Sequence, residues 1–164
     1  MNAQRNASTG PRPRQGYNRP VPTRLRMGLV MRRDMDFGEL GDMEASLRAD
    51  GVSLAPISTG DASLISSGVT VLATATAADI TGGRVKGLVV PGGSADEAGV
   101  AVVRELLDLA RTHGVPVLAF GEAVALAADV FETAADAPGA VFRGDKAALI
   151  NDRAQLSAVV ATIS

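Results

Sequence analysis

Two short apolar strands, each ending at glycine and running directly into a helical pattern, constrain this chain most strongly. The first covers residues 87–90 and ends at Pro91-Gly92-Gly93-Ser94, and the second covers residues 117–120 and ends at Gly121-Glu122. Continuous apolar runs of this length are typical of strands buried on both faces of a parallel sheet. Because the carboxyl ends of parallel strands meet at one edge, we expect the two turns to lie side by side and to form the functional site there.

The rest of the chain alternates between short apolar strands and segments with helical periodicity, of which residues 103–110 are the clearest. We therefore predict an α/β fold: a doubly wound, mostly parallel sheet with helices on both faces. The expected strands cover 26–31, 52–57, 87–90, 117–120, 140–143 and 147–150, with a hairpin over 64–72, a polar connection over 79–86 and a final helix capped by Asn151 or Asp152.

Composition limits the domain organisation and the chemistry. With 46% hydrophobic residues among 164, the chain has enough apolar surface for one globular core. No apolar run reaches the roughly 18 residues of a membrane span, and no secretory signal is recognisable. We expect one domain over residues 27–164, no membrane span and a cytoplasmic location. The sequence contains no cysteine, which excludes disulfides, thiolate metal ligands and thiol catalysis. We expect neither a metal nor a cofactor.

The N-terminal segment, residues 1–26, differs from the rest in charge. It carries six of the 16 basic residues, all arginines, together with four prolines and none of the 18 acidic residues, which leaves the rest of the chain at a net charge of about −8. Such a segment buries too little apolar surface to offset its chain entropy, so we predict a disordered tail. Two interpretations remain open: a solvated extension, or an arm that binds an anionic surface such as RNA, a membrane or the acidic body of a partner.

Two motifs in a fixed order carry a family resemblance. One strand ends in Pro91-Gly92-Gly93, and a later strand ends in Ala119-Phe120-Gly121-Glu122-Ala123. With these motifs, the segment from residue 27 to the C-terminus resembles the PfpI-type superfamily, the intracellular-protease and Parkinsonism-associated deglycase group. The resemblance implies a class I glutamine-amidotransferase-like fold, which is a flavodoxin-like sandwich, and it places the family's nucleophile elbow at the second motif.

The resemblance also allows the family's catalytic groups to be checked by position. The elbow cysteine of active members falls on Gly121, and the residue after it, often histidine, is Glu122. The acidic residue that hydrogen-bonds the cysteine falls on Asp36, with Glu39 as the other choice, and the oxyanion-hole amides are those around Gly93. Loss of the nucleophile removes covalent catalysis, because no neighbouring base can activate a missing atom.

A narrower resemblance concerns residues 88–124. With glycine at the elbow, this stretch is similar to the C-terminal domain of large-subunit catalases, which carries the fold without its cysteine. The chain is far too short for a catalase core, and its only tyrosine, Tyr17, lies in the predicted tail. We therefore expect no haem and no peroxide chemistry.

Glu122 has two interpretations. A carboxylate at the first position of a helix is favoured by the macrodipole and the unpaired amides, which predicts a capping role. Alternatively, Glu122 and Asp36 approach each other and share a proton as a general acid/base pair, a hypothesis that depends on the family alignment.

The remaining polar candidates surround the first turn. Ser94 carries a hydroxyl, and its only histidine candidate as a base is His113, which we interpret instead as a cation at a helix C-terminus. Gly92 and Gly93 supply backbone freedom, and their amides are suited to a small anion at the helix start. The expected ligand-binding residues are Gly92, Gly93, Ser94, Gly121 and Glu122.

Two function classes follow. We favour a non-catalytic PfpI-like protein that self-associates, as a dimer, and binds a partner or a small ligand. The alternative is a carboxylate-based hydrolase or lyase, deglycase-like or glyoxalase-like, that acts on small carbonyl compounds through Glu122 and Asp36.

Overall fold

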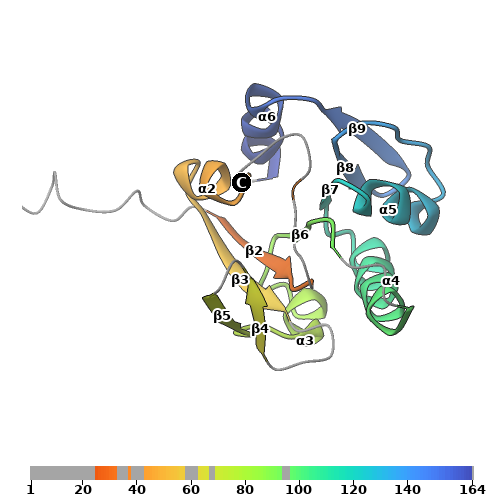
Figure 1. Cartoon of the computed structure of the whole chain (residues 1–164). Helices are drawn as coiled ribbons and strands as arrows, with labels where there is room; N and C mark the ends of the chain where they lie inside the picture. Colours follow the sequence, from red (N-terminus) through yellow and green to blue (C-terminus); the bar gives the residue numbers. More distant parts are fainter. Residues whose placement is uncertain are drawn as a thin grey trace, which may run out of the picture.

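The computed structural model of the chain (Figure 1) describes residues 25–32, 37, 43–57, 63–66, 69–93 and 97–163. Residues 1–24 of the predicted tail lie outside this range, as do Asp36, Glu39 and Ser94. No helix of the described residues is long and apolar enough to cross a membrane.

The core of the fold is one mixed sheet of six strands. These are β2 (Leu25–Val30), β3 (Val52–Ile57), β6 (Gly87–Val90), β7 (Val117–Phe120), β8 (Gly139–Arg143) and β9 (Lys146–Ile150). They lie in the order β3-β2-β6-β7-β8-β9, in which β3, β2, β6 and β7 pair in parallel and the last two pairings are antiparallel. The predicted mostly parallel α/β sheet is confirmed.

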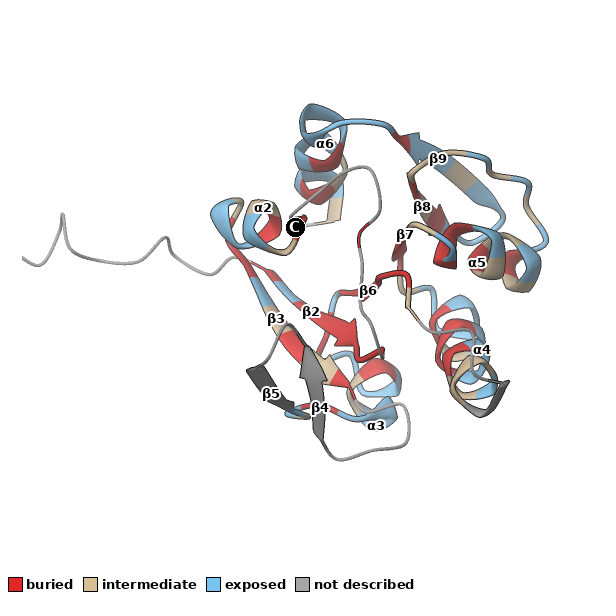
Figure 2. Cartoon of the chain, in the orientation of Figure 1, coloured by how far each residue is buried: buried red, intermediate tan, exposed pale blue. Residues whose placement is uncertain are grey.

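Five helices in the described part of the chain cover the two faces of the sheet (Figure 1). They are α2 (Met43–Ala49), α3 (Ala77–Thr81), α4 (Glu97–Thr112), α5 (Ala123–Phe131) and α6 (Arg153–Ile163). One core lies between the sheet and α3, α4 and α5, and the other lies between the sheet and α2 and α6. Strand alternation divides β7 between them, because Ala119 faces the first core and Phe120 the second. The central strands are buried on both faces (Figure 2).

The apolar stripe predicted for α4 is confirmed, since Val103, Leu107 and Ala110 are buried against the sheet. For α6, Asp152 is the capping residue: its Oδ1 accepts a hydrogen bond of 2.9 Å from the backbone N–H of Gln155. The expected hairpin is also present, as strands β4 (Ser63–Ser66) and β5 (Val69–Leu72) pair in an antiparallel ladder.

The first strand begins one residue earlier than the strand predicted over residues 26–31. Strand β2 begins at Leu25, which pairs with Val52 and is only 3% exposed. Arg26 points outward between two buried side chains, so the strand alternation extends further than the arginine-rich composition suggests.

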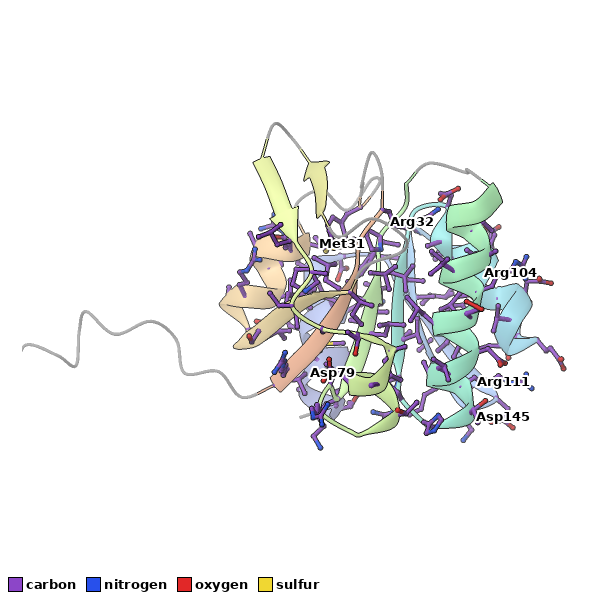
Figure 3. All side chains as sticks on the ribbon, turned by 90° about the horizontal axis from the view of Figure 1, so that it is seen from below. Met31, Arg32, Asp79, Arg104, Arg111 and Asp145 are labelled. Atoms are coloured by element: carbon purple, nitrogen blue, oxygen red, sulfur yellow. The ribbon has the colours of Figure 1, made fainter. Side chains whose placement is uncertain are left out.

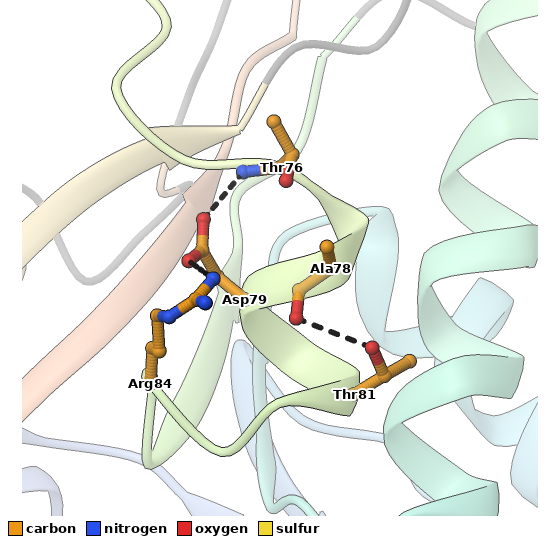
Figure 4. A network of polar contacts seen from close by, with 5 residues as sticks. All are labelled: Thr76, Ala78, Asp79, Thr81 and Arg84. Atoms are coloured by element: carbon orange, nitrogen blue, oxygen red, sulfur yellow. Dashed lines mark hydrogen bonds and ion pairs between the residues drawn. The ribbon is translucent and has the colours of Figure 1, made fainter.

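The expectation of a polar connection over residues 79–86 is also wrong at its start, because α3 occupies residues 77–81. Asp79 folds back onto the first residue of the turn: its Oδ2 accepts a hydrogen bond of 2.8 Å from the backbone N–H of Thr76 (Figure 4). Its Oδ1 pairs with Arg84 at 3.1 Å. A threonine followed three residues later by an acid is a helix-start signal, and it outweighs the two glycines that follow.

These contacts perturb the titration of Asp79. The pKa of its carboxyl is lowered from 3.8, first by the hydrogen bond from the Thr76 backbone and then by the hydrogen bond from Arg84. A carboxylate with a lowered pKa stabilises the fold above its unfolded pKa, and this contribution is lost as the pH falls through the folded value.

We predict that Asp79→Asn reduces the hydrogen-exchange protection of α3 at pH 7. The difference from the unsubstituted chain should decrease once the pH falls below 3.8 and disappear below the lowered pKa of the folded state, where the Asp79 carboxyl is neutral as well. Protection factors measured for Ile80 to Gly82 at several pH values test this. Asp136→Asn, at an exposed position, is the control and should leave α3 unchanged; a pH-independent difference would contradict the assignment.

Candidate functional site

The two glycine turns meet at the carboxyl edge of the sheet. Strands β6 and β7 are adjacent and parallel, with Val90 opposite Ala119. Directly beyond these residues, the backbone N–H of Gly93 donates a 3.2 Å hydrogen bond to Oε1 of Glu122. The predicted juxtaposition of the turns is therefore present, and a side chain of the second turn joins it to the first.

Gly121 forms the sharp turn of the elbow. Its φ of 58° lies in the left-handed region, which glycine adopts without the steric cost of a Cβ atom. Its N–H donates to the carbonyl of Pro138 at 2.9 Å, and its own carbonyl accepts from Val124 at 3.2 Å. Phe120, the residue before this turn, is buried, and its ring packs edge-on against Phe37 with 5.3 Å between the ring centroids.

Arg32 is the residue that the sequence analysis missed. It lies two residues after the end of β2, and its side chain is only 3% exposed. Its Nη1 lies 2.8 Å from Oε1 of Glu122 and donates to the carbonyl of Pro91 at 3.2 Å. Figure 3 places Arg32 at one end of the strands, whereas Asp79 and Arg111 lie near the other end. We call Arg32, Pro91, Gly93 and Glu122 the elbow cluster.

The capping hydrogen bond expected of the Glu122 side chain is not formed. Glu122 stands at the N-terminus of α5, but its side chain makes no capping hydrogen bond to that helix. The carboxylate turns instead toward the buried guanidinium of Arg32, because a charge out of water requires a partner of opposite sign. Within the elbow cluster, Oε1 of Glu122 therefore forms an ion pair with Arg32 and accepts a backbone hydrogen bond from Gly93.

The elbow cluster leaves one acceptor unused. Both contacts of Glu122 involve Oε1, and none of the described residues donates to Oε2. The side chain is 49% exposed, so Oε2 is accessible to solvent or to a donor on a ligand. By contrast, the Gly93 amide, the position expected to bind an anion, already holds a resident carboxylate.

The other predicted site residues are distributed as follows. Gly92 is buried and Gly93 is half-buried at the first turn, and neither has the positive φ expected of a glycine there, so that expectation is wrong. Asp36, Glu39 and Ser94 lie outside the described residues. His113 follows the C-terminus of α4, with its Nδ1 3.0 Å from the carbonyl oxygen of Leu109. Since α4 has 16 residues, it separates His113 from the elbow by about 24 Å of helix.

No metal centre is apparent in the ranges that the structure describes, where no group of three histidine, aspartate or glutamate side chains is arranged to hold an ion. Among the described residues, the groups available at the edge are one guanidinium, one carboxylate and the backbone amides of the two turns. These groups can bind and orient a polar ligand.

Comparison with known proteins identifies the fold. No protein-family model and no curated protein matches the chain. Among solved structures, a candidate protease I from Bacteroides thetaiotaomicron is similar over 85% of this chain and 99% of its own, with a TM-score of 0.61 and 11% identity. A DJ-1 superfamily protein from Agrobacterium tumefaciens is similar over 69% of this chain and 63% of its own, with a TM-score of 0.53 and 18% identity.

These likenesses support the predicted resemblance to the PfpI and DJ-1 type of protein at the level of the fold. The narrower resemblance to the C-terminal domain of large-subunit catalases stays a prediction. The two similarities cover 85% and 69% of this chain, and at 11% and 18% identity they concern overall shape alone.

We predict that Glu122→Ala lowers the free energy of unfolding by about 1–3 kcal/mol, the range for hydrogen bonds to charged groups. The loss arises because Arg32 is buried and its compensation by Glu122 is removed. Asp129→Ala is the matched control: it breaks the Arg104–Asp129 pair of 2.6 Å, whose side chains are 46% and 66% exposed, and should cost less than about 1 kcal/mol. Urea unfolding measures both variants, and equal losses would show that burial of Arg32 does not strengthen the elbow pair.

Proposed function

We propose that this chain, which has the fold of the PfpI and DJ-1 proteins, is a non-catalytic binding protein that acts through self-association and through a partner or a small ligand. One observation carries the proposal: the elbow position at which the family resemblance places a cysteine is Gly121, and the sequence contains no cysteine. A glycine has no atom that can attack a carbonyl group, so the covalent route is closed.

The elbow cluster supports the same interpretation. Acyl transfer requires amides that are available to a developing oxyanion. The Gly93 amide instead donates to Glu122, and the Arg32 guanidinium forms an ion pair with the same oxygen. An incoming oxyanion would have to displace a negatively charged side chain from both donors. The edge is therefore suited to a ligand that offers donors to Oε2.

The alternative, a hydrolase or lyase of small carbonyl compounds that uses Glu122 and Asp36, is favoured by one observation. Glu122 is half-exposed, and Oε2 has no donor among the residues described, so a carboxylate oxygen is available to accept a proton. The placement of Asp36 beside it remains a prediction from the family resemblance.

We predict that the purified protein shows no turnover of α-oxoaldehydes, activated esters or small amides above the buffer rate, and that Glu122→Ala does not change this result. The reason is the missing nucleophile at position 121. Turnover is measured as product formation at saturating substrate, and Asp129→Ala is the control for a general loss of surface charge. Turnover that is abolished by Glu122→Ala and retained by Asp129→Ala would establish the carboxylate-based enzyme instead.

For self-association, the outer edge of the sheet at β9 is the proposed interface. Strand β9 is the last strand of the sheet, and Leu149 on it is 46% exposed. An edge strand offers unpaired backbone groups to a second copy, and a two-fold axis would place the same strand on both sides of the contact.

We predict that the protein sediments as a dimer and that Leu149→Glu converts it to a monomer, because a charge is placed at the β9 edge. Leu72→Glu is the matched control, since Leu72 is 63% exposed on β5, outside this sheet. Sedimentation equilibrium over a range of concentrations measures both. A monomeric unsubstituted chain, or equal dissociation in the two variants, would rule out the β9 interface.

The proposal includes two further predictions from the sequence, a cytoplasmic location and an anionic partner for the arginines of residues 1–26. Both depend on composition. The arginines of residues 1–26 require a negatively charged surface as their partner.

A further inference from the structure

A groove between α3 and α4 lies on the face of the sheet that these helices cover. It encloses about 460 Å³, within the usual size of a ligand site. The buried residues Ile57, Ala75 and Leu106 line its floor, and the exposed residues Glu105 and Asp108 line it from α4. The groove thus combines an apolar floor with two carboxylates of the same sign.

Three acidic side chains elsewhere in the described chain have arginine partners. Glu44 pairs with Arg48, Asp79 with Arg84, and Asp129 with Arg104. For Glu105 and Asp108, in contrast, the described part of the chain provides no ion pair and no hydrogen bond to the side chain. Two adjacent uncompensated negative charges beside an apolar floor favour a cationic ligand with an apolar body.

The chain itself contains a segment of this chemistry. Residues 11–22 read Pro-Arg-Pro-Arg-Gln-Gly-Tyr-Asn-Arg-Pro-Val-Pro, with three arginines, four prolines and no acidic residue. Arginine stems pack on apolar surface while the guanidinium group pairs with carboxylates. Proline fixes the backbone φ angle, which reduces the entropy lost on docking.

The exit point of this segment is close to one wall of the groove. The chain enters β2 at Leu25, and the backbone N–H of Lys86 donates to the carbonyl of Arg26 at 2.8 Å. Lys86 lies in the connection that follows α3, the helix whose first turn lines the groove. The arginines of this segment lie 6 to 13 residues before Leu25, so they reach about 20–45 Å from it when extended, which is the scale of a domain with a radius of gyration of about 14 Å.

We infer that residues 11–22 dock in the α3–α4 groove of their own chain, with arginines on Glu105 and Asp108 and prolines on the apolar floor. Docking withholds the arginines from other anions, so an external anionic partner competes with the groove. The inference is independent of whether the elbow is catalytic.

Because the sequence has no cysteine, Asn18→Cys creates a single attachment point for a nitroxide spin label in the full chain. We predict that the label causes a loss of intensity in the methyl signals of Leu106 and Leu109 and leaves those of Leu149 on β9 unchanged. Glu105→Gln/Asp108→Asn should restore the lost intensity. Asp136→Asn/Asp145→Asn removes the same charge at exposed positions outside the groove lining and should not.

The outcomes separate clearly. Loss of intensity at the groove that only the Glu105→Gln/Asp108→Asn variant reverses supports the inference. No loss at Leu106 and Leu109, loss at other signals in their place, or equal reversal by both double variants would overturn it. Mixing spin-labelled protein with isotopically labelled, cysteine-free protein tests the second copy: an equal loss in that mixture shows docking between chains and overturns docking within one chain.

Discussion

The parallel pairing of β6 with β7 is the constraint on which the rest of the structure depends. Both strands lie in the middle of the sheet and are buried on both faces, so every side chain along them is apolar. Polar groups are excluded from the interior of such a sheet and collect where the strands end. The two glycine turns are therefore the places at which this architecture can hold polar groups next to each other, and the Gly93–Glu122 hydrogen bond joins them there.

The polar groups at this edge satisfy one another. Arg32 is brought to the edge by β2, which lies beside β6, and its burial requires a negative partner. Glu122 supplies the charge from the second turn, and the Gly93 amide adds a donor from the first. The elbow cluster thus connects the ends of three adjacent strands. Among the described residues, this edge contains an ion pair whose carboxylate side chain is half-exposed.

The sequence predicts the sheet, the stripe of α4 and the meeting of the turns, because each depends on local periodicity and on the rule that parallel strands share an edge. The sequence does not predict that Arg32 is buried, because an arginine after a strand has the same local pattern whether it is solvated or buried. Its pairing with Glu122 is also hidden, because the two residues are distant in sequence. The sequence also misses α3, where five residues form a helix through the contact between Asp79 and Thr76. The sequence does not show that Leu25 belongs to the strand, because the arginines on either side of it resemble the predicted tail.

Compensation of charge also distinguishes the two surfaces of interest. Among the described residues of the elbow, the negative charge of Glu122 is paired with Arg32, so this pair is suited to recognition by hydrogen-bond geometry rather than by net charge. In the α3–α4 groove no described cation balances Glu105 and Asp108, so recognition there is governed by charge and is weakened by salt. Because the arginines of residues 1–26 are the largest concentration of positive charge in the sequence, they belong with the groove rather than with the elbow. The elbow cluster is therefore suited to recognition by hydrogen-bond geometry, and the α3–α4 groove is suited to recognition by charge.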